Sequence, residues 1–564
     1  MEPVTPTRNQ QPKTFFYFAL KYKETVTMAN KKLQVWLPLI FSIVLIGGMF
    51  FGFKLRENTP SGNGFFRADK KTSLQEILDL VRQRYVDPVR LDSLQYGAID
   101  EMMSHLDPHS IFIPASNLQE VNEDLLGNFD GIGVEFNIFS DTVHIVHVLA
   151  NGPSDKAGLQ VGDKIIKVNN EPVAGTSITS DEIKKKIRGE RNTPVKITIL
   201  RKGETKEVSI TRGSIPLYAV DAAYKLNDST GYIKLNKFSE SAYEEFMKSL
   251  ETLLETKITN LVLDLRGNGG GFMNEAVQIA DQFLSGDKLV VYTQGANVPK
   301  IEYKCKTPGL FEEGGLVVLV DELSASASEV LAGALQDWCR ATIVGRRTFG
   351  KGLVQEQYSL SDGSAIRLTV ARYYTPKGRS IQRSYEKGKE KYLEEIADRY
   401  QNGEISHLDT SKVINGKIFK TQCGDTVYGG GGITPKIFVG LDTSSLHQNV
   451  NELFGSGLLN DFIYKYYINH IDEINKYNSP DEFIANYNND ESRWQELVNY
   501  AAKGNIDLTK VPANDKDFLQ KRIKAQLARY KWRSEGFYEV INNSDPAIKK
   551  ALEIIMTPKP KPKS

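Results

Sequence analysis

The chain has 564 residues, of which 40% are hydrophobic and 25% charged, so it is too long for one ordinary domain and has a globular composition. Its formal net charge of +1 gives no electrostatic support for a nucleic-acid partner. The three cysteines (Cys305, Cys339 and Cys423) are too few and too scattered for a disulfide framework or a zinc site, and we expect buried free thiols, with one disulfide as the alternative.

The N-terminal part contains an uncharged, apolar run from Val35 to Phe53, close to the length that crosses a bilayer as a helix. Lys and Arg outnumber Glu before this run, and this charge bias places the N-terminus in the cytoplasm. We therefore predict a transmembrane signal anchor at residues 33–53. A cleaved signal peptide is the competing interpretation, but no A-x-A cleavage pattern follows the run. Met28 offers an alternative start, which would make residues 1–27 an extension.

After a polar linker, residues 70–106 carry apolar side chains at helical spacing. The next stretch consists of short β-type runs (131–136, 142–148, 163–168 and 195–200) separated by turn residues, with one helical pattern at 179–188. Short strands around a single helix predict a small β-rich domain that ends near Arg212.

From about residue 213 to 385, apolar strands alternate with helical patterns. The strands predicted at 261–265, 316–320 and 342–344 are largely apolar, as expected for strands that a parallel sheet buries on both faces. Residues 386–425 are polar, rich in Lys and Glu, and have the composition of an insertion. Residues 441–556 show mostly helical patterns, and the Pro- and Lys-rich tail is expected to be disordered.

Three loops that follow or adjoin these strands carry complementary chemistry. Gly267–Gly271 offers unobstructed backbone N–H groups, Ser324–Ser328 offers hydroxyls, and the segment around Lys351 offers an amine. Because the carboxyl ends of parallel strands meet at one edge of a sheet, we expect the three loops to lie close together.

Each of these residues also has a purely structural explanation. Outward-pointing N–H groups at a strand-to-helix junction would stabilise a serine alkoxide, but serine is equally a common helix N-cap. Lys351 can act as a general base only if burial lowers its pKa, and is otherwise a solvated loop lysine. The glycines could form a plain tight turn. His144 and His147 are three apart on a predicted strand, so we expect them to face opposite ways and to share no metal; no cofactor is expected.

Several motifs between about residues 70 and 440 resemble the C-terminal processing (tail-specific) peptidases, a family of Ser–Lys serine proteases with a PDZ domain. They are Leu106–Ser110, Gly131–Val134, Gly152–Leu159 with Gly162–Ile166, Asp264–Gly271, Ser324–Glu329, Thr348–Gln355, Tyr374–Arg379 and Gly432–Pro435. Each motif alone is weak, but their order along the chain is highly specific.

The resemblance implies both a fold and a site. The fold is an α/β protease core of the ClpP/crotonase type, in which helices flank a parallel-containing sheet and a β-rich PDZ domain is inserted. The family pattern selects Ser326 as the nucleophile and Lys351 as the base, with Gln355 helping to orient the amine. The oxyanion hole would be formed by the backbone N–H groups of Ala327 and of Gly270 or Gly271.

The PDZ-like region suggests how substrates are selected. A PDZ domain binds an extended peptide as an added strand and holds its terminal carboxylate with backbone N–H groups. By the resemblance, the peptide-binding residues would be Gly131, Ile132, Gly133, Val134 and Phe136. The substrates would then be proteins or peptides with free C-termini.

The predicted organisation follows from these patterns. It comprises a cytoplasmic segment at 1–32, the anchor at 33–53, a linker and N-terminal helical part of the core at 54–115, the PDZ domain at 116–212, the Ser–Lys protease core at 213–440 with the insertion at 386–425, a helical C-terminal region at 441–556 and the tail at 557–564. We expect a single-pass endopeptidase of the bacterial inner membrane, with its catalytic part in the periplasm, that cleaves through an acyl-enzyme. The insertion and the C-terminal region could bind an adaptor protein, build a homo-oligomer or cover the site.

Three other functions are less consistent with the sequence. A PDZ scaffold on an inactive protease core would often have lost Ser326, Lys351 or Gln355, and all three are present. A trypsin-like PDZ protease needs a serine in a GNSGG-type loop, whereas residues 267–271 contain none. A crotonase-like acyl-CoA enzyme would share a related core but would not require an export anchor.

Overall fold

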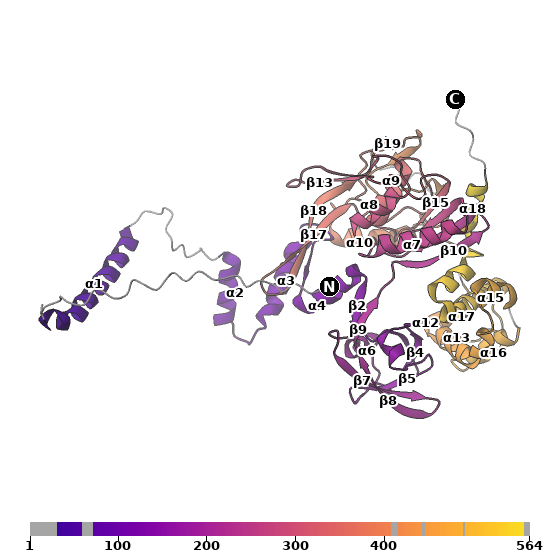
Figure 1. Ribbon diagram of the computed structural model, residues 1–564, viewed down its shortest axis with the longest axis horizontal. Coiled ribbons are helices and arrows are strands. Elements are labelled where there is room, and N and C mark those ends of the chain that lie inside the picture. Colours follow the sequence, from indigo (N-terminus) through magenta and orange to yellow (C-terminus); the bar gives the residue numbers. More distant parts are fainter. Residues whose placement is uncertain (1–30, 59–71, 408–415, 443–445, 489–490, 558–564) are drawn as a thin grey trace, which may run out of the picture. The chain divides into compact units, whose positions relative to one another are not determined.

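The computed structural model describes residues 31–58, 72–407, 416–442, 446–488 and 491–557 (Figure 1). The chain divides into two compact units, residues 1–91 and residues 92–564. Parts of the predicted cytoplasmic segment, linker, insertion and tail (1–30, 59–71, 408–415 and 558–564) lie outside the described residues.

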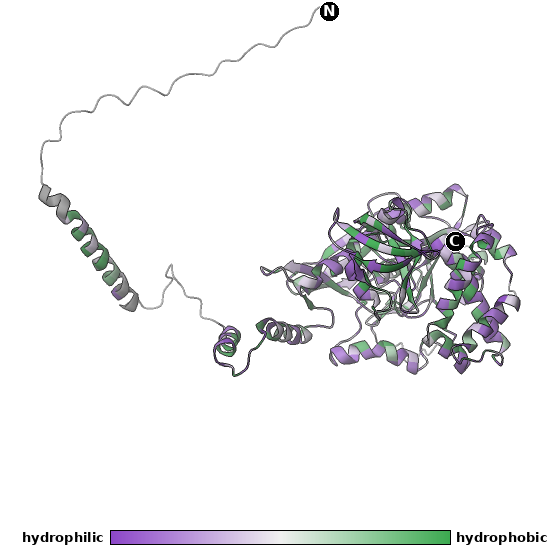
Figure 2. Cartoon of the chain, turned by 90° about the horizontal axis from the view of Figure 1, so that it is seen from below, coloured by the Kyte–Doolittle hydropathy of each residue, from purple (hydrophilic) through white to green (hydrophobic). Residues whose placement is uncertain are grey.

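The first unit contains the helices α1 (Lys31–Asn58) and α2 (Ser73–Arg84). α2 confirms the helical pattern after residue 70, and the side chain of Thr72 caps it by accepting a hydrogen bond from the backbone of Gln75. α1 covers the predicted anchor, and its described middle part is hydrophobic (Figure 2). Its described large apolar side chains are exposed. No helix in the described part of the chain is both long and apolar enough to cross a membrane, so the anchor predicted at 33–53 is not supported. The side chains of residues 31–35 and 53 are outside those described.

The second unit is built around a mainly parallel six-stranded sheet. Its strands are β10 (Val220–Asn227), β11 (Thr230–Leu235), β12 (Asn260–Asp264), β15 (Gly315–Val320), β16 (Thr342–Gly345) and β21 (Ile437–Phe438), in that spatial order. All neighbours from β11 to β21 are parallel, which confirms the predicted parallel sheet; only β10 runs antiparallel to β11.

Both faces of this sheet are buried, as the apolar strand sequences predict. Leu261 and Leu263 of β12 belong to the core formed with α7 (Ala242–Glu255), α8 (Met273–Asp281) and α9 (Ala327–Asp337). Val262, which lies between them, packs on the opposite face against α18 (Pro546–Met556). Because successive residues of a strand point to opposite faces, the apolar run is explained by helices on both sides.

A second, antiparallel sheet brings distant motifs together. It contains β1 (Ile111–Ile113), β13 (Leu289–Gln294), β14 (Ile301–Lys304), β17 (Leu353–Ser359) and β18 (Ala365–Tyr374). β18 pairs with both β1 and β17. The segment before β1, which follows α3 (Leu91–Ser104), is thereby brought near the lysine loop that precedes β17.

The predicted PDZ region forms a compact β-domain that follows α4 (Ala115–Leu126). Its sheet has the order β3 (Val134–Phe139), β4 (Thr142–Val148), β5 (Lys164–Val168), β7 (Pro194–Arg201) and β8 (Glu204–Thr211), with β6 (Glu171–Pro172) beside β5. β2 (Asn128–Gly131) pairs with β9 (Gly213–Pro216) at its base, and α5 (Pro153–Lys156) is a single short turn. α6 (Ser180–Ile187) starts with a Thr179–Glu182 capping box, which confirms the one predicted helix.

The orientation predicted for the two histidines of β4 is wrong. His147 lies opposite Glu135 and His144 opposite Asn137, with a register shift between Glu135 and Phe136. This bulge inserts one extra residue and restores both rings to the same face. His144 packs against Tyr464 and His147 lies 3.4 Å from Arg533, so both rings contact the C-terminal helical region.

The helical prediction for residues 441–556 is confirmed. The helices are α12 (Gln448–Gly455), α13 (Leu458–Asn469), α14 (Ile471–Ile474), α15 (Pro480–Asn486), α16 (Glu491–Ala502), α17 (Ala513–Asn542) and α18. Their apolar core includes Phe139 and Val146 of the PDZ region. The C-terminal region therefore packs on the PDZ region through α13 and α17 and on the parallel sheet through α17 and α18.

The predicted insertion is folded onto the protease core. It contains α10 (Lys389–Gln401), β19 (Ile418–Lys420) and the start of a hairpin with β20 (Thr426–Tyr428). Cys339 and Cys423 form a disulfide that ties this segment to the end of α9. Free thiols were therefore the wrong expectation for this pair, because the fold brings together two cysteines that lie 84 residues apart; Cys305 is a buried free thiol, as expected.

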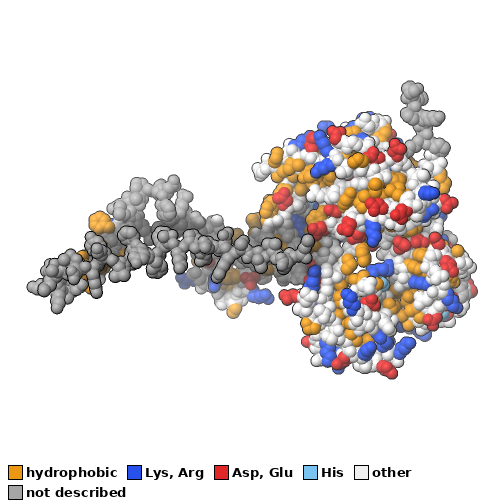
Figure 3. Space-filling view, viewed as in Figure 1, with side chains coloured by type: hydrophobic (Ala, Val, Ile, Leu, Met, Phe, Trp, Pro, Cys, Tyr) orange, Lys and Arg blue, Asp and Glu red, His pale blue; other side chains and the backbone are white. Residues whose placement is uncertain are grey.

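Side chains of both charges are interspersed over the face seen in Figure 3.

Candidate active site

Ser326 stands where the loop after β15 enters α9. Its φ of 56° and ψ of −114° are strained for a residue with a side chain. The loop is fixed by Asp321, whose Oδ1 accepts hydrogen bonds from the N–H groups of Gly267 (2.9 Å) and Ser324 (3.1 Å). One carboxylate thus holds the serine loop against the glycine loop.

The carboxylate of Glu329 joins the serine loop to the lysine loop. Glu329 is fully buried in the first turn of α9. Its Oε2 accepts hydrogen bonds from the backbone N–H groups of Ser326 (2.9 Å) and Lys351 (2.8 Å). Its Oε1 accepts from the N–H of Gly350 (2.7 Å) and the hydroxyl of Thr348 (2.5 Å). The backbones of both predicted catalytic residues are therefore held by a single oxygen atom.

Burial raises the pKa of Glu329 from 4.5 to about 7, because the ionised form loses its hydration. The hydrogen bonds from Thr348, Lys351, Ser326 and Gly350 oppose this rise by stabilising the anion. Near neutral pH the group is therefore poised between its two protonation states, with the anion held by a full set of donors.

The amine of Lys351 is in an environment suited to a base. Burial lowers its pKa below 10.5 and the charge of Arg367 lowers it further, whereas Glu329 and Asp107 oppose the change. A lowered pKa is what a general base requires, since only the neutral amine can accept a proton. The preceding Gly350 has a φ of 88°, and a Cβ there would lie only 3.2 Å from the backbone N of Gly432. Glycine therefore allows the lysine loop to pack closely.

Gln355, the residue predicted to orient the amine, hydrogen-bonds to Leu106–Ser110, the first of the motifs that carry the family resemblance. Its Nε2 donates to the backbone carbonyl of His109. Asp107 holds the same turn by accepting from the N–H groups of His109 (2.8 Å) and Ser110 (3.0 Å). Burial, followed by the charge of Lys351, lowers the pKa of His109 to about 4, so its ring is neutral at physiological pH. The motif lies beside the lysine and contributes no charged imidazole.

The predicted oxyanion residues lie together. A Cβ on Gly270 would be 2.8 Å from the Ser326 Cβ and 3.0 Å from the backbone N of Ala327. The N–H of Gly270 donates to Asn268 Oδ1 at 2.9 Å and is therefore engaged. Ala327, the first residue of α9, has no acceptor for its N–H within its own helix. Of the two glycines left open by the sequence, Gly270 lies beside Ser326 but has an engaged N–H, whereas a Cβ on Gly271 would meet Phe238.

Tyr373 adds a buried phenol to the site. Its phenol lies close enough to the Ser326 side chain for that group to affect the pKa of Tyr373, and its backbone N–H donates to the Gly352 carbonyl at 2.8 Å. Burial raises the pKa of Tyr373 well above 10 despite the hydrogen bond, so the phenol stays protonated. Tyr373 therefore places a neutral phenol near the serine hydroxyl and adds no charge to the site.

The segment predicted as an insertion supports the lysine loop. Arg399 of α10 is buried and donates to the backbone carbonyl of Thr348 at 2.8 Å. Tyr392 of the same helix bonds through its hydroxyl to His109 Nε2 at 2.8 Å. Two side chains of the segment thus contact the loops of the candidate site.

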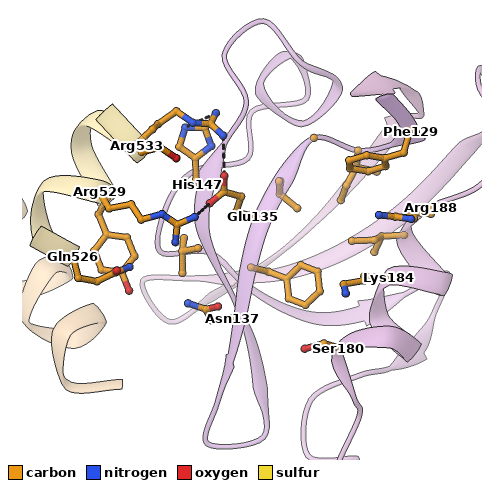
Figure 4. Close-up of a pocket in the computed structure, with 18 residues that line it drawn as sticks. Phe129, Glu135, Asn137, His147, Ser180, Lys184, Arg188, Gln526, Arg529 and Arg533 are labelled. Carbon is orange, nitrogen blue, oxygen red and sulfur yellow. Dashed lines mark hydrogen bonds and ion pairs between the residues drawn. The ribbon is translucent and has the colours of Figure 1, made fainter. Parts of the chain in front are cut away.

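A separate cavity of about 400 Å³ runs along β3 of the PDZ region (Figure 4). Of the predicted peptide-binding residues, Ile132, Gly133, Val134 and Phe136 line it. Gly131 does not: it lies in β2, opposite Gly213. The cavity is also bordered by side chains of α6 and α17, which are Ser180, Lys184, Ile187, Gln526, Arg529, Tyr530 and Arg533.

The sequence contained a signal for one of the unassigned site residues. Ser326-Ala-Ser-Glu329 fits the S-x-x-E pattern of a capping box, which places the fourth residue near the backbone of the first. Tyr373 and Arg399 had no such signal, because their contacts depend on strand pairing and on long-range packing. Among the described residues, no group of His, Cys, Asp and Glu side chains could hold a metal ion.

Comparisons with known families match three regions of the chain. Peptidase family S41 matches residues 229–388, the PDZ domain matches residues 131–211, and a family of unknown function (DUF8443) matches residues 449–533. The carboxy-terminal-processing protease of Bartonella bacilliformis is 35% identical over 313 residues, which cover 54% of this chain and 71% of that protein. The carboxyl-terminal-processing protease of Synechocystis is 35% identical over 382 residues, which cover 63% and 87%. Among solved structures, a photosystem II D1 C-terminal processing protease is 26% identical, with a TM-score of 0.34 over 65% of this chain and 87% of that one.

Proposed function

Because this chain belongs to the carboxy-terminal-processing proteases of peptidase family S41, and is therefore a serine-type endopeptidase, we propose that Ser326 is its nucleophile and Lys351 its general base. The shared Glu329 oxygen carries this assignment, since it fixes the two backbones to one another. The strained φ of Ser326 and the burial of Lys351 give further support.

In the proposed acylation step, the neutral amine of Lys351 accepts the hydroxyl proton of Ser326. The serine oxygen forms a bond to the scissile carbonyl carbon, and the carbonyl electron pair moves to its oxygen. The N–H groups of Ala327 and of Gly270 or Gly271 bind that oxyanion, a contribution of about 3–4 kcal/mol by analogy with other serine proteases. Tyr373 and Gln355 act as positioning residues for the hydroxyl and the amine.

Collapse of the tetrahedral intermediate breaks the carbon–nitrogen bond. Protonated Lys351 gives its proton to the leaving amine, which departs as the new N-terminus. Water then attacks the acyl-enzyme and gives a proton to Lys351. Lys351 returns this proton to the Ser326 oxygen as the carboxylic acid product leaves. Protons balance over the cycle, and no cofactor is required.

We further propose that the PDZ region selects protein C-termini. Val134 and Phe136 provide apolar walls to the cavity along β3, and the Ile132–Val134 loop would present backbone N–H groups to the terminal carboxylate. The PDZ family match at residues 131–211 supports this role. An inactive scaffold is less consistent with the site, because it would not need the burial that lowers the pKa of Lys351.

We also propose that the chain is a single-pass protein of the bacterial inner membrane, with its catalytic part in the periplasm. This location is supported by the basic residues before α1, the exposed apolar side chains of that helix, and a disulfide of the kind that persists in oxidising compartments. Fractionation of cells that express the tagged chain tests this location, and we expect the catalytic part in the membrane fraction. Added protease should digest it only after the outer membrane has been opened. Recovery in the cytosolic fraction would contradict it.

The catalytic assignment is tested with a fluorogenic peptide that has a free apolar C-terminus. Ser326→Ala and Lys351→Arg should each reduce kcat/KM by at least about 10³-fold, since guanidinium cannot deprotonate. Ser249→Ala and Lys248→Arg on α7, of which Ser249 is half-buried and Lys248 exposed, serve as matched controls and should retain activity. Cleavage by Lys351→Arg at the wild-type rate would refute the assigned base.

A further inference from the structure

The edge strand β3 has a helix beside it on each face of its sheet. In the described sheet β3 pairs with β4 and forms an edge, so its other side can accept an added peptide strand. The cavity at this edge is lined by α6 of the PDZ region and by α17 of the C-terminal region, which flank β3 from opposite sides in Figure 4. The second wall therefore comes from outside the PDZ region.

Side chains of β3 alternate between these two walls. Val134 and Phe136 pack with the PDZ core on the α6 side. Glu135 points toward α17, where its carboxylate lies 2.8 Å from Arg533 and 3.6 Å from Arg529 (Figure 4). A peptide strand added beside β3 alternates in the same way, so every second peptide side chain faces α17.

The α17 wall presents two guanidinium groups to the cavity. Among the described residues, the carboxylate within ion-pair distance of Arg529 and Arg533 is that of Glu135, and the more buried Asp221 also lies within the electrostatic range of both arginines. The arginine side chains are 45% and 41% exposed, so both remain accessible to a ligand. Burial, with the charge of Arg533, lowers the pKa of His147 below 6.5, so its ring does not change this balance at neutral pH. Lys184 and Arg188 line the opposite side of the cavity, where they pair with Asp181 at 3.2 Å and with Glu123 at 3.4 Å, so the guanidinium groups that share one ion-paired carboxylate are those of α17.

Arg533 is also held in an unusual backbone conformation. Its φ of 59° and ψ of −147° interrupt α17. A non-glycine residue in this region is strained, and such strain is concentrated at functional positions. The distortion coincides with the residue whose guanidinium reaches Glu135 on the edge strand.

We propose that this cavity selects C-termini with Asp or Glu as the penultimate residue, and that Arg529 and Arg533 of α17 bind that side chain. The inference rests on the proposed function, because the PDZ region must hold the C-terminus as a strand. With the terminal side chain directed toward Val134 and Phe136, the penultimate one faces α17. Its carboxylate shares the guanidinium groups with Glu135 through charge-assisted hydrogen bonds. The C-terminal region is thereby a specificity element of the peptide site.

Binding of labelled peptides to the full-length Ser326→Ala chain tests this inference by fluorescence anisotropy. Three peptides differ only in having a penultimate Glu, a penultimate Gln, or the penultimate Glu with an amidated C-terminus. We expect the Glu peptide to bind about threefold to tenfold more tightly than the Gln peptide. In the Arg529→Gln/Arg533→Gln background this preference should disappear while affinity for the Gln peptide stays within about twofold.

Two further variants keep the test decisive. Lys521→Gln, exposed on α17 and paired with Asp517, should retain the preference. Glu135→Gln removes the competing carboxylate and should increase the preference, a gain that misfolding cannot produce. Equal binding of Glu and Gln peptides, or a preference that survives loss of both arginines, overturns the inference. Equal binding of the free and amidated peptides would instead reject the proposed recognition of the C-terminal carboxylate. This comparison is independent of the one between the Glu and Gln peptides.

Discussion

At the scale of single residues, Glu329 determines how the catalytic loops meet. It accepts hydrogen bonds from the backbones of Ser326, Lys351 and Gly350 and from the hydroxyl of Thr348. It touches none of the proposed reacting atoms, so it is a positioning residue. A carboxylate offers acceptor sites on both oxygens, and an amide of the same shape offers only one oxygen.

Glu329→Gln should therefore lower kcat about tenfold to a hundredfold with little change in KM, because the loops lose the two hydrogen bonds that one carboxylate oxygen accepts, and shift apart. Steady-state kinetics on the fluorogenic peptide measure this split. Glu251→Gln, exposed on α7, is the matched control. Unchanged kcat in Glu329→Gln would show that the loops are held in place without this carboxylate.

The same residue makes a pH-dependent contribution to stability. The pKa of Glu329 is about 7 in the folded chain and 4.5 as an ordinary value. The folded state therefore binds the extra proton, and the stability it gives is complete below pH 4.5 and lost as pH rises through about 7. Urea unfolding across this range should show a decline that is about 3 kcal/mol larger in the wild type than in Glu329→Gln, since other buried carboxyl groups such as Glu539 contribute equally to both proteins. Identical pH profiles for the two proteins would contradict the raised pKa.

The lowered pKa of Lys351 predicts the acidic limb of the activity profile. Because only the neutral amine accepts the serine proton, kcat/KM should rise with pH through an apparent pKa below 10.5. The limb should persist in Glu329→Gln, which separates Lys351 from the carboxyl group that titrates nearby. A limb at or above pH 10.5, the ordinary lysine value, would exclude a desolvated base.

At the scale of elements, the sequence predicts those helices and strands that depend on local residue patterns. The buried strands before Gly267 and Ser324 were predictable from their apolar runs, because a parallel sheet buries both faces of a strand. The β4 bulge was not, because a one-residue shift in pairing depends on the partner strand and leaves no periodic signal. The contacts of Arg399 and the pairing of Cys339 with Cys423 were hidden for the same reason, since they depend on how a distant segment folds back.

The disulfide between α9 and the folded-back segment should stabilise the core. Its closure constrains a loop of 84 residues in the unfolded chain. Cys339→Ser/Cys423→Ser is therefore expected to lower the free energy of unfolding by about 3–5 kcal/mol under oxidising conditions. Reductant should destabilise the wild type and the Cys305→Ala control to a similar extent and leave the double variant unaffected. A double variant as stable as the wild type would show that the bond has no role in the native state.

At the scale of the whole molecule, the C-terminal region belongs to two structures at once. α17 borders the peptide cavity of the PDZ region, and α18 covers the second face of the protease sheet. Arg266, which follows β12, pairs with Asp545 at the start of α18 at 2.7 Å. The helical composition of 441–556 was readable from its sequence, but its packing was not, because nothing in a helix pattern identifies which sheet face it covers.

Removing a buried side chain of α18 should therefore destabilise the protease core. Ile548 is 2% exposed and packs in the cluster with Val262, Val317 and Leu319. Ile548→Ala is expected to lower the free energy of unfolding by about 2–4 kcal/mol, through lost burial and the cavity left behind. The neighbouring Lys549→Ala, which is exposed, should have little effect. Equal stability of the two variants would mean that α18 is dispensable for the sheet.

The central claim, that Lys351 activates Ser326, is tested most directly by trapping the acyl-enzyme. A peptide p-nitrophenyl ester acylates the nucleophile quickly, and acid quenching followed by peptide mapping by mass spectrometry locates the acyl group. We predict an adduct on Ser326 in the wild type and its loss in both Ser326→Ala and Lys351→Arg. An adduct on Ser324 or Ser328, or undiminished acylation of Ser326 in Lys351→Arg, would contradict the account.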